Sequence, residues 1–308
     1  MADATAHTGA PQKRRSRGLS EKGLAFWMVT PSMTLIALVA VYPILYAIWL
    51  SMHEYSLISA GVSRWASPAG LGNYIDAFQN AEFIDSIVTT FIFTISSVFL
   101  ETVIGLVMAL IMATAFKGQG LLRTVVLVPW AVLTVVTAIM WRTITDPNLG
   151  FLNQLLGTNT VWLGEEPQAL IIMILADTWK TAPFMALLLL AGLQVIPGEI
   201  YEAAKVDGAT AWQRFRRITL PLLMPALLVA LIFRTLDALR AFDLPKVLTN
   251  GANGTTTMSL IAQRTFQENR LYGEGAAYSI ITFLVVMIVS FAYIRFVGGN
   301  IRGLTEDR

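Results

Sequence analysis

The chain has 308 residues, of which 55% are hydrophobic and only 14% are charged. Soluble domains have about 45–50% apolar and about 25% charged residues, so this composition excludes an ordinary soluble domain and predicts an integral membrane protein. A formal net charge of +2 gives no indication of a nucleic-acid partner. The absence of cysteine excludes disulfides, thiolate metal ligands and cysteine nucleophiles, and two separated histidines, His7 and His53, do not suggest a metal site.

Residues 1–22 form a polar, basic tail that we expect to be disordered. The apolar run after the tail is too long for a signal peptide, so we expect it to remain as a membrane helix. Crossing about 30 Å of hydrocarbon takes about 20 apolar residues, and six runs are long enough. The predicted spans are residues 24–50, 86–116, 124–144, 169–193, 222–247 and 276–297. The sequence therefore predicts an all-α membrane protein with one six-span domain over residues 24–297 and a short tail over residues 298–308.

Basic residues are distributed unevenly between the two sides of these spans. They are frequent in the N-terminal tail, the 117–123 turn, the 194–221 segment and the C-terminal tail, and rarer in the loops on the other side. Loops rich in lysine and arginine stay in the cytoplasm. We therefore predict a multi-pass protein of the cytoplasmic (inner) membrane, with both termini and the 194–221 segment on the cytoplasmic side.

The charged segment between the fourth and fifth predicted spans has the pattern of two short helices joined by a turn. Glu202 lies near the start of this segment, and three arginines lie near its end. Acids near a helix start and bases near a helix end complement the helix dipole. Gly208 can adopt a positive φ and so permits a sharp turn, and Pro221 fits the first turn of the next helix. Ala203 and Ala204 leave a smooth patch that another backbone can approach. We interpret this segment as a docking element for a soluble partner; the alternative is an ordinary charged loop.

Within the fifth predicted span we single out four ionisable residues at three-residue spacing, Arg234, Asp237, Arg240 and Asp243, and assign Lys246 to the loop that follows. Charges within a membrane are costly and usually functional. One interpretation is a ladder of ion pairs along the helix that stabilises a subunit interface, because i,i+3 neighbours of opposite sign can pair. The other places the last three along a translocation path, with Phe242 as a stacking surface. Such a mixture suits a sugar, whose hydroxyls need polar partners and whose C–H face needs an aromatic ring.

Further candidates for such a path are Glu101, Asp177, Trp179 and Lys180, although Asp177 and Lys180 can also pair with each other at i,i+3. A membrane-embedded enzyme would need clustered acids or histidines at a membrane face, and the sequence shows no such cluster. It also has no Gly-x-x-x-x-Gly-Lys-Ser/Thr phosphate loop. We therefore predict no catalytic residue and no metal or nucleotide site. A self-sufficient secondary transporter or channel for a polar solute remains the alternative, but it would have no use for a docking element.

The docking element reads Glu-Ala-Ala from Glu202, three residues, Gly208, nine residues, Ile218, one residue and Leu220-Pro221. This spacing resembles the cytoplasmic coupling signature of ABC import permeases. The resemblance implies that the residues coupled to an ATPase are Glu202, Ala203, Ala204, Asp207, Gly208, Ile218 and Pro221.

Other segments resemble the carbohydrate branch of these permeases, of the maltose and trehalose type: Tyr42-Pro43 and residues 70–74, 150–153, 179–184 and 191–197. Residues 233–243 with 179–181 are most similar to trehalose permeases of actinobacteria. One departure is Gly-Ala-Asn-Gly at residues 251–254, where relatives usually have a Gly-Gly-Pro-like turn. The resemblance implies the six-helix fold of type I ABC importer permeases and passage of a di- or oligosaccharide, with trehalose as the best match.

The same resemblance implies a set of partners. They are a second homologous permease subunit, an ATPase dimer that binds ATP and Mg, an extracytoplasmic sugar-binding protein or lipoprotein, and the surrounding membrane lipid. No cofactor is expected in this chain itself, and the substrate path would be formed by Asp237, Arg240, Phe242, Asp243, Trp179, Lys180 and Glu101.

Overall fold

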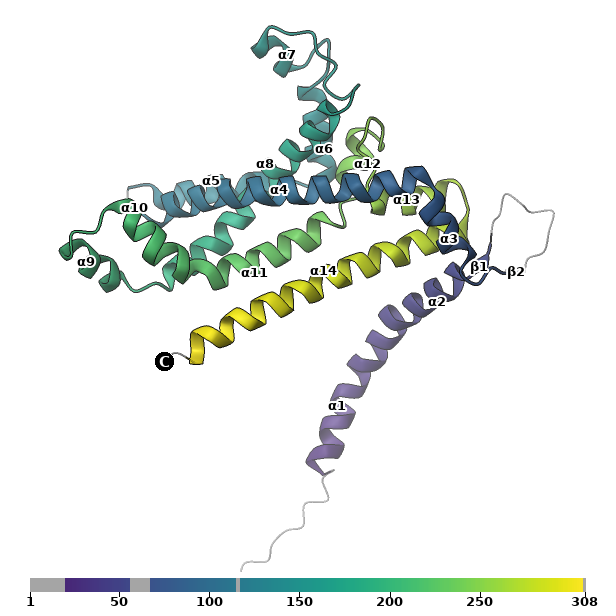
Figure 1. Ribbon diagram of the computed structural model, residues 1–308, viewed down its shortest axis with the longest axis horizontal. Helices are drawn as coiled ribbons and strands as arrows, with labels where there is room; N and C mark the ends of the chain where they lie inside the picture. The colour runs from purple at the N-terminus through teal and green to yellow at the C-terminus, as the bar shows by residue number, and fades with distance from the viewer. Residues whose placement is uncertain (1–19, 56–66, 115–116, 307–308) are drawn as a thin grey trace, which may run out of the picture. The chain divides into compact units, whose positions relative to one another are not determined.

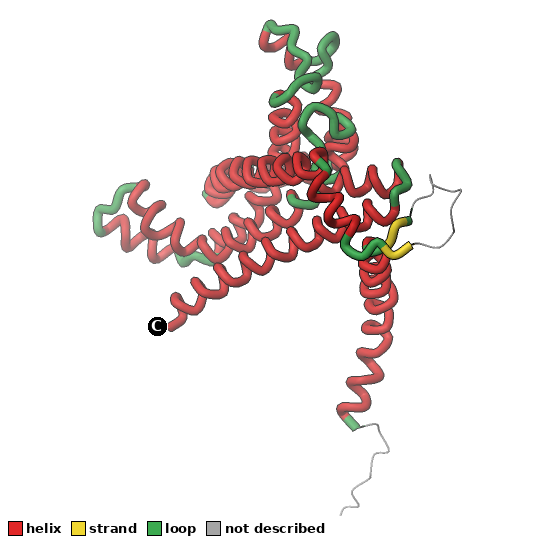
Figure 2. The backbone as a smooth tube through the Cα atoms, turned by 45° about the vertical axis from the view of Figure 1, so that its right-hand side comes forward, coloured by secondary structure: helices red, strands yellow, loops and turns green. Residues whose placement is uncertain are grey.

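The computed structural model describes residues 20–55, 67–114 and 117–306, so most of the tail expected to be disordered lies outside the described residues. Most of the described chain is helical, with loops between the helices (Figure 2). The strands in it, β1 (His53–Glu54) and β2 (Ser67–Pro68), pair antiparallel with each other. A helix satisfies its backbone hydrogen bonds internally, which is the condition for crossing lipid.

The helices, including three π-helical turns (η), follow in this order: α1 (Glu21–Ile36), η1 (Ala37–Val41), α2 (Tyr42–Ser51), α3 (Gly72–Gln79), α4 (Ala81–Ala113), α5 (Gln119–Ala131), α6 (Thr134–Ile144), α7 (Phe151–Leu156), α8 (Gln168–Gln194), α9 (Gly198–Val206), α10 (Ala211–Arg214), η2 (Phe215–Thr219), α11 (Leu220–Ala238), α12 (Asp243–Leu248), α13 (Met258–Gln263), η3 (Arg264–Glu268) and α14 (Tyr272–Glu306) (Figure 1). Helix α14 continues beyond the predicted sixth span, so the described part of the expected C-terminal tail is helical.

The chain divides into two compact units, residues 1–47 and residues 48–308. The described part of the first unit is one apolar helical stretch that runs through α1 and η1 into α2. Pro43 cannot donate to the carbonyl of Val39, and the π-helical turn of η1 lies around that position. The second unit holds the remaining elements and the candidate sites below.

Within the described residues, the helices long and apolar enough to cross a membrane are Lys22–Ser51, Ala81–Ala113, Gln168–Gln194, Ala211–Ala238 and Tyr272–Arg295. The third predicted span is instead a bent pair, α5 and α6, which meet at 89°. One continuous helix over residues 124–144 is therefore a wrong prediction. Val132 and Leu133 adopt extended backbone between the two helices, shortly after Pro129, which lacks a backbone donor. Six spans result when this pair is counted as one broken span.

The fifth predicted span also differs, because α11 ends at Ala238 and not at residue 247. A new helix, α12, begins at Asp243 after a short non-helical link. An acid in the first turn stabilises a helix N-terminus, and Pro245 is tolerated there. Arg240 and Asp243 consequently lie at a break between two helices and not along one continuous helix.

Helices α4, α8 and α11 pack against one another through small residues. A methyl group on Gly105 would lie 2.7 Å from Cγ of Met185, and one on Gly192 would lie 2.4 Å from Cβ of Ala226. Close backbone approach at glycine is a common way to pack helices in membranes, where burial supplies little driving force between helices. The three helices thus form the framework that positions the candidate site.

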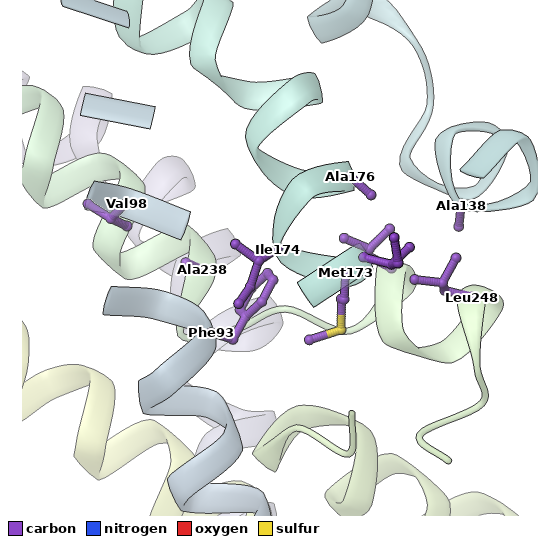
Figure 3. Close-up of a cluster of buried hydrophobic side chains, with 10 residues drawn as sticks. Phe93, Val98, Ala138, Met173, Ile174, Ala176, Ala238 and Leu248 are labelled. Carbon is purple, nitrogen blue, oxygen red and sulfur yellow. The ribbon is translucent and has the colours of Figure 1, made fainter. Parts of the chain in front are cut away.

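A buried apolar cluster fixes the broken helices to this framework (Figure 3). Its members come from α4 (Phe93, Val98), α6 (Ala138), α8 (Ile172, Met173, Ile174, Ala176), the end of α11 (Ala238) and α12 (Leu244, Leu248). The cluster therefore holds both sides of the break between α11 and α12 against α4 and α8.

Candidate functional site

A buried cluster of charges joins α4, α8 and α11. The guanidinium of Arg234, whose side chain is 3% exposed, donates to both carboxylate oxygens of Glu101, at 2.5 and 2.7 Å. It also donates to Asp177 at 3.1 Å and to Asp237 at 2.5 Å. Glu101 is fully buried and accepts a further hydrogen bond from the hydroxyl of Thr181 at 2.6 Å. Arg234 is thus the common partner of three carboxylates, and it holds two of them, Asp177 and Asp237, next to a cavity.

This cavity has a volume of about 150 Å³ and lies at the break between α11 and α12. Its lining residues are Thr134, Asp177, Lys180, Thr181, Asp237, Ala238, Arg240, Ala241, Phe242, Asp243 and Leu244. Carboxylates, amino and guanidinium groups and one aromatic ring converge in a small space, which is the lining expected of a site for a polar organic solute. We call it the first cavity.

The structure brings most of the predicted pathway residues together. Lys180, Asp237, Arg240, Phe242 and Asp243 all line the first cavity, although they come from two segments of the chain. Two predicted residues do not line it: Trp179, whose exposed fraction is 38%, and Glu101, which lies behind the lining as the partner of Arg234.

The ladder of ion pairs along the fifth span is a wrong prediction beyond its first step. Arg234 and Asp237 do pair, but Arg240 donates from Nε to the carbonyl of Leu236 at 3.0 Å and forms no ion pair within the described residues. The helix ends before Arg240, so the geometry required for i,i+3 pairing is lost there. The alternative pairing of Asp177 with Lys180 is also not formed, because Asp177 pairs with Arg234.

The predicted docking element forms the two helices and the turn expected of it. Helix α9 ends at Val206, and Gly208 follows with φ of +79°, a conformation that glycine adopts without steric cost. Helix α10 begins with a capping box between Thr210 and Gln213. The ammonium of Lys205 lies 2.7 Å from Glu202 and holds the pKa of that carboxyl below its usual range by hydrogen bonding and charge.

A groove of about 460 Å³ lies in this element, lined by Asp207, Gly208, Ala209, Gln213, Arg214, Arg217 and Ile218. Two large apolar side chains beside it point to solvent, since Val206 is 88% exposed and Trp212 is 65% exposed. Exposed apolar side chains rimmed by charges are typical of a protein–protein contact surface. Pro221 lies in the first turn of α11, as the sequence predicts.

The comparisons with known proteins decide the class. The family model for the inner-membrane component of binding-protein-dependent transport systems matches residues 77–302. The chain belongs to this family. It is therefore a permease, a multi-pass membrane component of a transport system and not an enzyme, and its resemblance to ABC import permeases is confirmed.

Relatives of this permease are similar over nearly the whole chain. The trehalose/maltose transport system permease protein MalF of Thermococcus litoralis is 42% identical over 89% of this chain and 94% of the relative. The trehalose transport system permease protein SugA of Mycobacterium tuberculosis is 38% identical over 94% of both chains. A chain of a bacterial ABC transporter that imports the acidic polysaccharide alginate has a TM-score of 0.77 and 25% identity, over 89% of this chain and 94% of that chain. The predicted type I ABC importer permease fold is thereby confirmed.

The sequence alone did not reveal the pairing that holds this permease's site together. Glu101 and Arg234 are 133 residues apart, and Asp177 and Arg234 are 57 residues apart. The available signal was a single glutamate in the middle of a long apolar run, which requires a buried cationic partner. The cationic candidates within the predicted spans include Lys180, Arg234 and Arg240, and the sequence alone does not choose between them.

Proposed function

We propose that this permease forms part of an ATP-driven importer that passes a di- or oligosaccharide, with trehalose as the specific substrate, into the cytoplasm. The observation that carries the proposal is the lining of the first cavity, where Asp237 and Asp243 accept, Lys180 and Arg240 donate, and Phe242 offers an aromatic face. Two relatives that are named for trehalose or trehalose/maltose transport support the choice of sugar.

The proposed path is completed by a second, homologous permease subunit. Small-molecule sites usually measure about 300–1,000 Å³, and the first cavity, at about 150 Å³, is smaller than that. Asp237 also keeps 68% of its side chain exposed although α11 is apolar enough to cross a membrane. A charge in such a position needs water or protein next to it and not lipid. A facing subunit with an aqueous path between the two meets that requirement.

An ATPase dimer and an extracytoplasmic sugar-binding protein are the remaining proposed partners. The docking element supplies the cytoplasmic contact through Glu202, Ala203, Ala204, Asp207, Gly208, Ile218 and Pro221, and the ATPase dimer binds ATP and Mg. For one structural neighbour, a bacterial alginate ABC transporter, the complex with a pentasaccharide-bound periplasmic protein is known. Delivery of the sugar by a separate protein also agrees with the family to which this chain belongs.

Replacing Asp243 with asparagine tests the role of the first cavity. Losing a charged hydrogen bond costs about 1.5–3 kcal/mol, so sugar uptake is expected to fall by at least about tenfold. The yield of assembled transporter should stay near the wild-type level, because Asp243 forms no ion pair within the described residues. Asp85→Asn, an exposed change on α4 outside the cavity, is the matched control. Unchanged uptake by the Asp243 variant would remove this residue from the path.

Single cysteines test the proposed orientation, in which the docking element is cytoplasmic, and the chain has no native cysteine to interfere. Leu149 is 82% exposed in the loop between α6 and α7, and Ala211 is exposed at the start of α10. In sealed cells, an impermeant thiol reagent should label Leu149→Cys and leave Ala211→Cys unlabelled until detergent opens the membrane. The reverse pattern would show that the protein has the opposite orientation.

A further inference from the structure

We infer that this permease has a second saccharide-binding cavity, between α13–η3 and α14, that continues the path of the first cavity. The inference rests on the proposed function, because it concerns the same solute. The second cavity has a volume of about 560 Å³. Arg240 lines both cavities, so they adjoin at this residue.

The chemistry of the second cavity differs from that of the first. None of the described residues that line it carries a carboxylate; their polar groups are amides, hydroxyls and the guanidinium of Arg240, and two phenylalanine rings, Phe266 and Phe283, lie among them. Neutral donors and acceptors beside aromatic rings suit an uncharged, polyhydroxylated ring, which can bond at its rim and stack on its C–H face. The absence of acids in the lining argues against a cationic ligand.

Two side chains of the second cavity, Gln263 and Phe266, are already positioned to contact a ligand. The amide nitrogen of Gln263 donates to Gln267 at 2.9 Å, which leaves its buried Oε1 without a donor among the described residues. A buried acceptor without a partner is costly, and a sugar hydroxyl would satisfy it. The ring of Phe266 is held by a perpendicular contact with Tyr272, with centroids 4.9 Å apart. The amide of Gln263 and the ring of Phe266 are therefore each held in one orientation by a neighbouring side chain.

The π-helical turn η3 places these groups next to α14. A methyl group on Gly275 of α14 would lie 2.6 Å from the backbone nitrogen of Phe266, so the two elements approach as closely as their backbones allow. π-Helical turns are frequent at functional sites. This close contact holds Phe266 against α14, the helix that supplies the other wall of the second cavity.

The lining of the second cavity is mostly apolar, and its polar groups are what favour a saccharide over lipid. An acyl chain in the second cavity would lie against the guanidinium of Arg240 and two glutamine amides, and hydrocarbon provides no partner for any of them. The guanidinium uses only its Nε in a hydrogen bond within the described residues, so its other N–H groups remain available. A solute in contact with Arg240 can therefore bond in both cavities at once. The permease should accordingly favour saccharides of two or more rings.

Protection from thiol labelling tests the second cavity in the complete transporter, with its partner subunits and binding protein present. Ser279→Cys on α14 reports on the second cavity, Thr134→Cys on the first, and Ile288→Cys on the exposed apolar side of α14 away from the cavity. A charged methanethiosulfonate should label the first two and leave Ile288→Cys unreactive. Saturating trehalose, with a non-hydrolysable ATP analogue, should slow the labelling of both by about tenfold or more.

The outcomes separate this inference from the proposed function. Protection at Thr134→Cys without protection at Ser279→Cys would show that the second cavity does not bind the saccharide. The sugar path through the first cavity would then still stand. An unreactive Ser279→Cys would overturn the second cavity too, because the surface would then be covered by lipid or by the partner subunit. Protection at neither position would contradict the proposed function itself.

Uptake kinetics supply a second measurement. Gln263→Leu removes the unpartnered acceptor, and the apparent affinity for a disaccharide should weaken by up to about tenfold while complex yield is kept. Ile288→Leu is the control, because Ile288 is exposed and lies on the face of α14 opposite the lining residues. Wild-type kinetics in Gln263→Leu would show that this side chain does not contact the sugar. The second cavity would then no longer be assigned as a saccharide-binding site.

Discussion

Replacing Arg234 with methionine is expected to abolish assembly of the transporter. The change leaves Glu101, which is fully buried, and Asp177, whose side chain is 15% exposed, without their cationic partner. Removing one member of a buried ion pair costs about 3–5 kcal/mol, which is a large share of the stability of a protein. The yield of complex purified in detergent should therefore fall to a small fraction of the wild-type yield.

The other members of the charge cluster make this prediction sharper. Glu101→Gln should cost much less, because Arg234 keeps its contacts with Asp177 and Asp237. Adding Glu101→Met to Arg234→Met should restore part of the yield, since a buried pair removed whole costs less than a broken one. Arg240→Met is the control, because Arg240 forms no ion pair within the described residues. Normal yield in Arg234→Met, or no recovery in the double variant, would mean that the cluster does not hold α4, α8 and α11 together.

Replacing Gly208 with proline is expected to abolish sugar uptake while membrane insertion stays normal. Proline fixes φ near −65°, whereas Gly208 has φ of +79°, so the turn between α9 and α10 cannot form. A methyl group at Gly208 would meet no atom within 4 Å, so the effect comes from the backbone and not from crowding. If this element transmits ATPase closure to the membrane helices, ATP hydrolysis should continue without transport.

Asparagine at the same position is the matched control. It tolerates the left-handed conformation better than other non-glycine residues, so Gly208→Asn should keep most of the transport activity. Glu202→Lys, which reverses the charge beside Lys205, should behave like the proline variant. Wild-type uptake in Gly208→Pro and Glu202→Lys would argue that this element does not couple the ATPase to the path.

Local features of the chain were the ones predictable from its sequence. The helix–turn–helix of the docking element depends on Gly208, nearby charges and Pro221, all within a short segment. The clustering of Asp237, Arg240, Phe242 and Asp243 was predictable for the same reason, since these residues are close in sequence. The break after Ala238 was missed although the sequence signals it: Arg240, Asp243 and Lys246 interrupt the apolar run, and Asp243 and Pro245 together are a helix-start signal.

Contacts between distant segments were not predictable in this way. Nothing local to Glu101 identifies Arg234 as its partner, because the pairing depends on how α4 and α11 each pack against α8, at Gly105 and Gly192 respectively. The second cavity needs the close approach of η3 to α14 at Gly275, and a π-helical turn has no clear sequence pattern of its own. The sequence therefore predicts most helices and the charged residues on them. Which of these residues contact one another depends on how the helices pack.

Uptake of labelled trehalose into proteoliposomes tests the central claim most directly. The vesicles would contain this permease with its second permease subunit and ATPase dimer, with the sugar-binding protein on the outer side and ATP on the ATPase side. If the protein is a permease of an ATP-driven importer, trehalose should accumulate in the vesicles. This accumulation should require both ATP and the binding protein, and it should be lost in Gly208→Pro. Accumulation by this chain alone, driven by an ion gradient and indifferent to ATP and to the binding protein, would contradict this function and establish a secondary transporter.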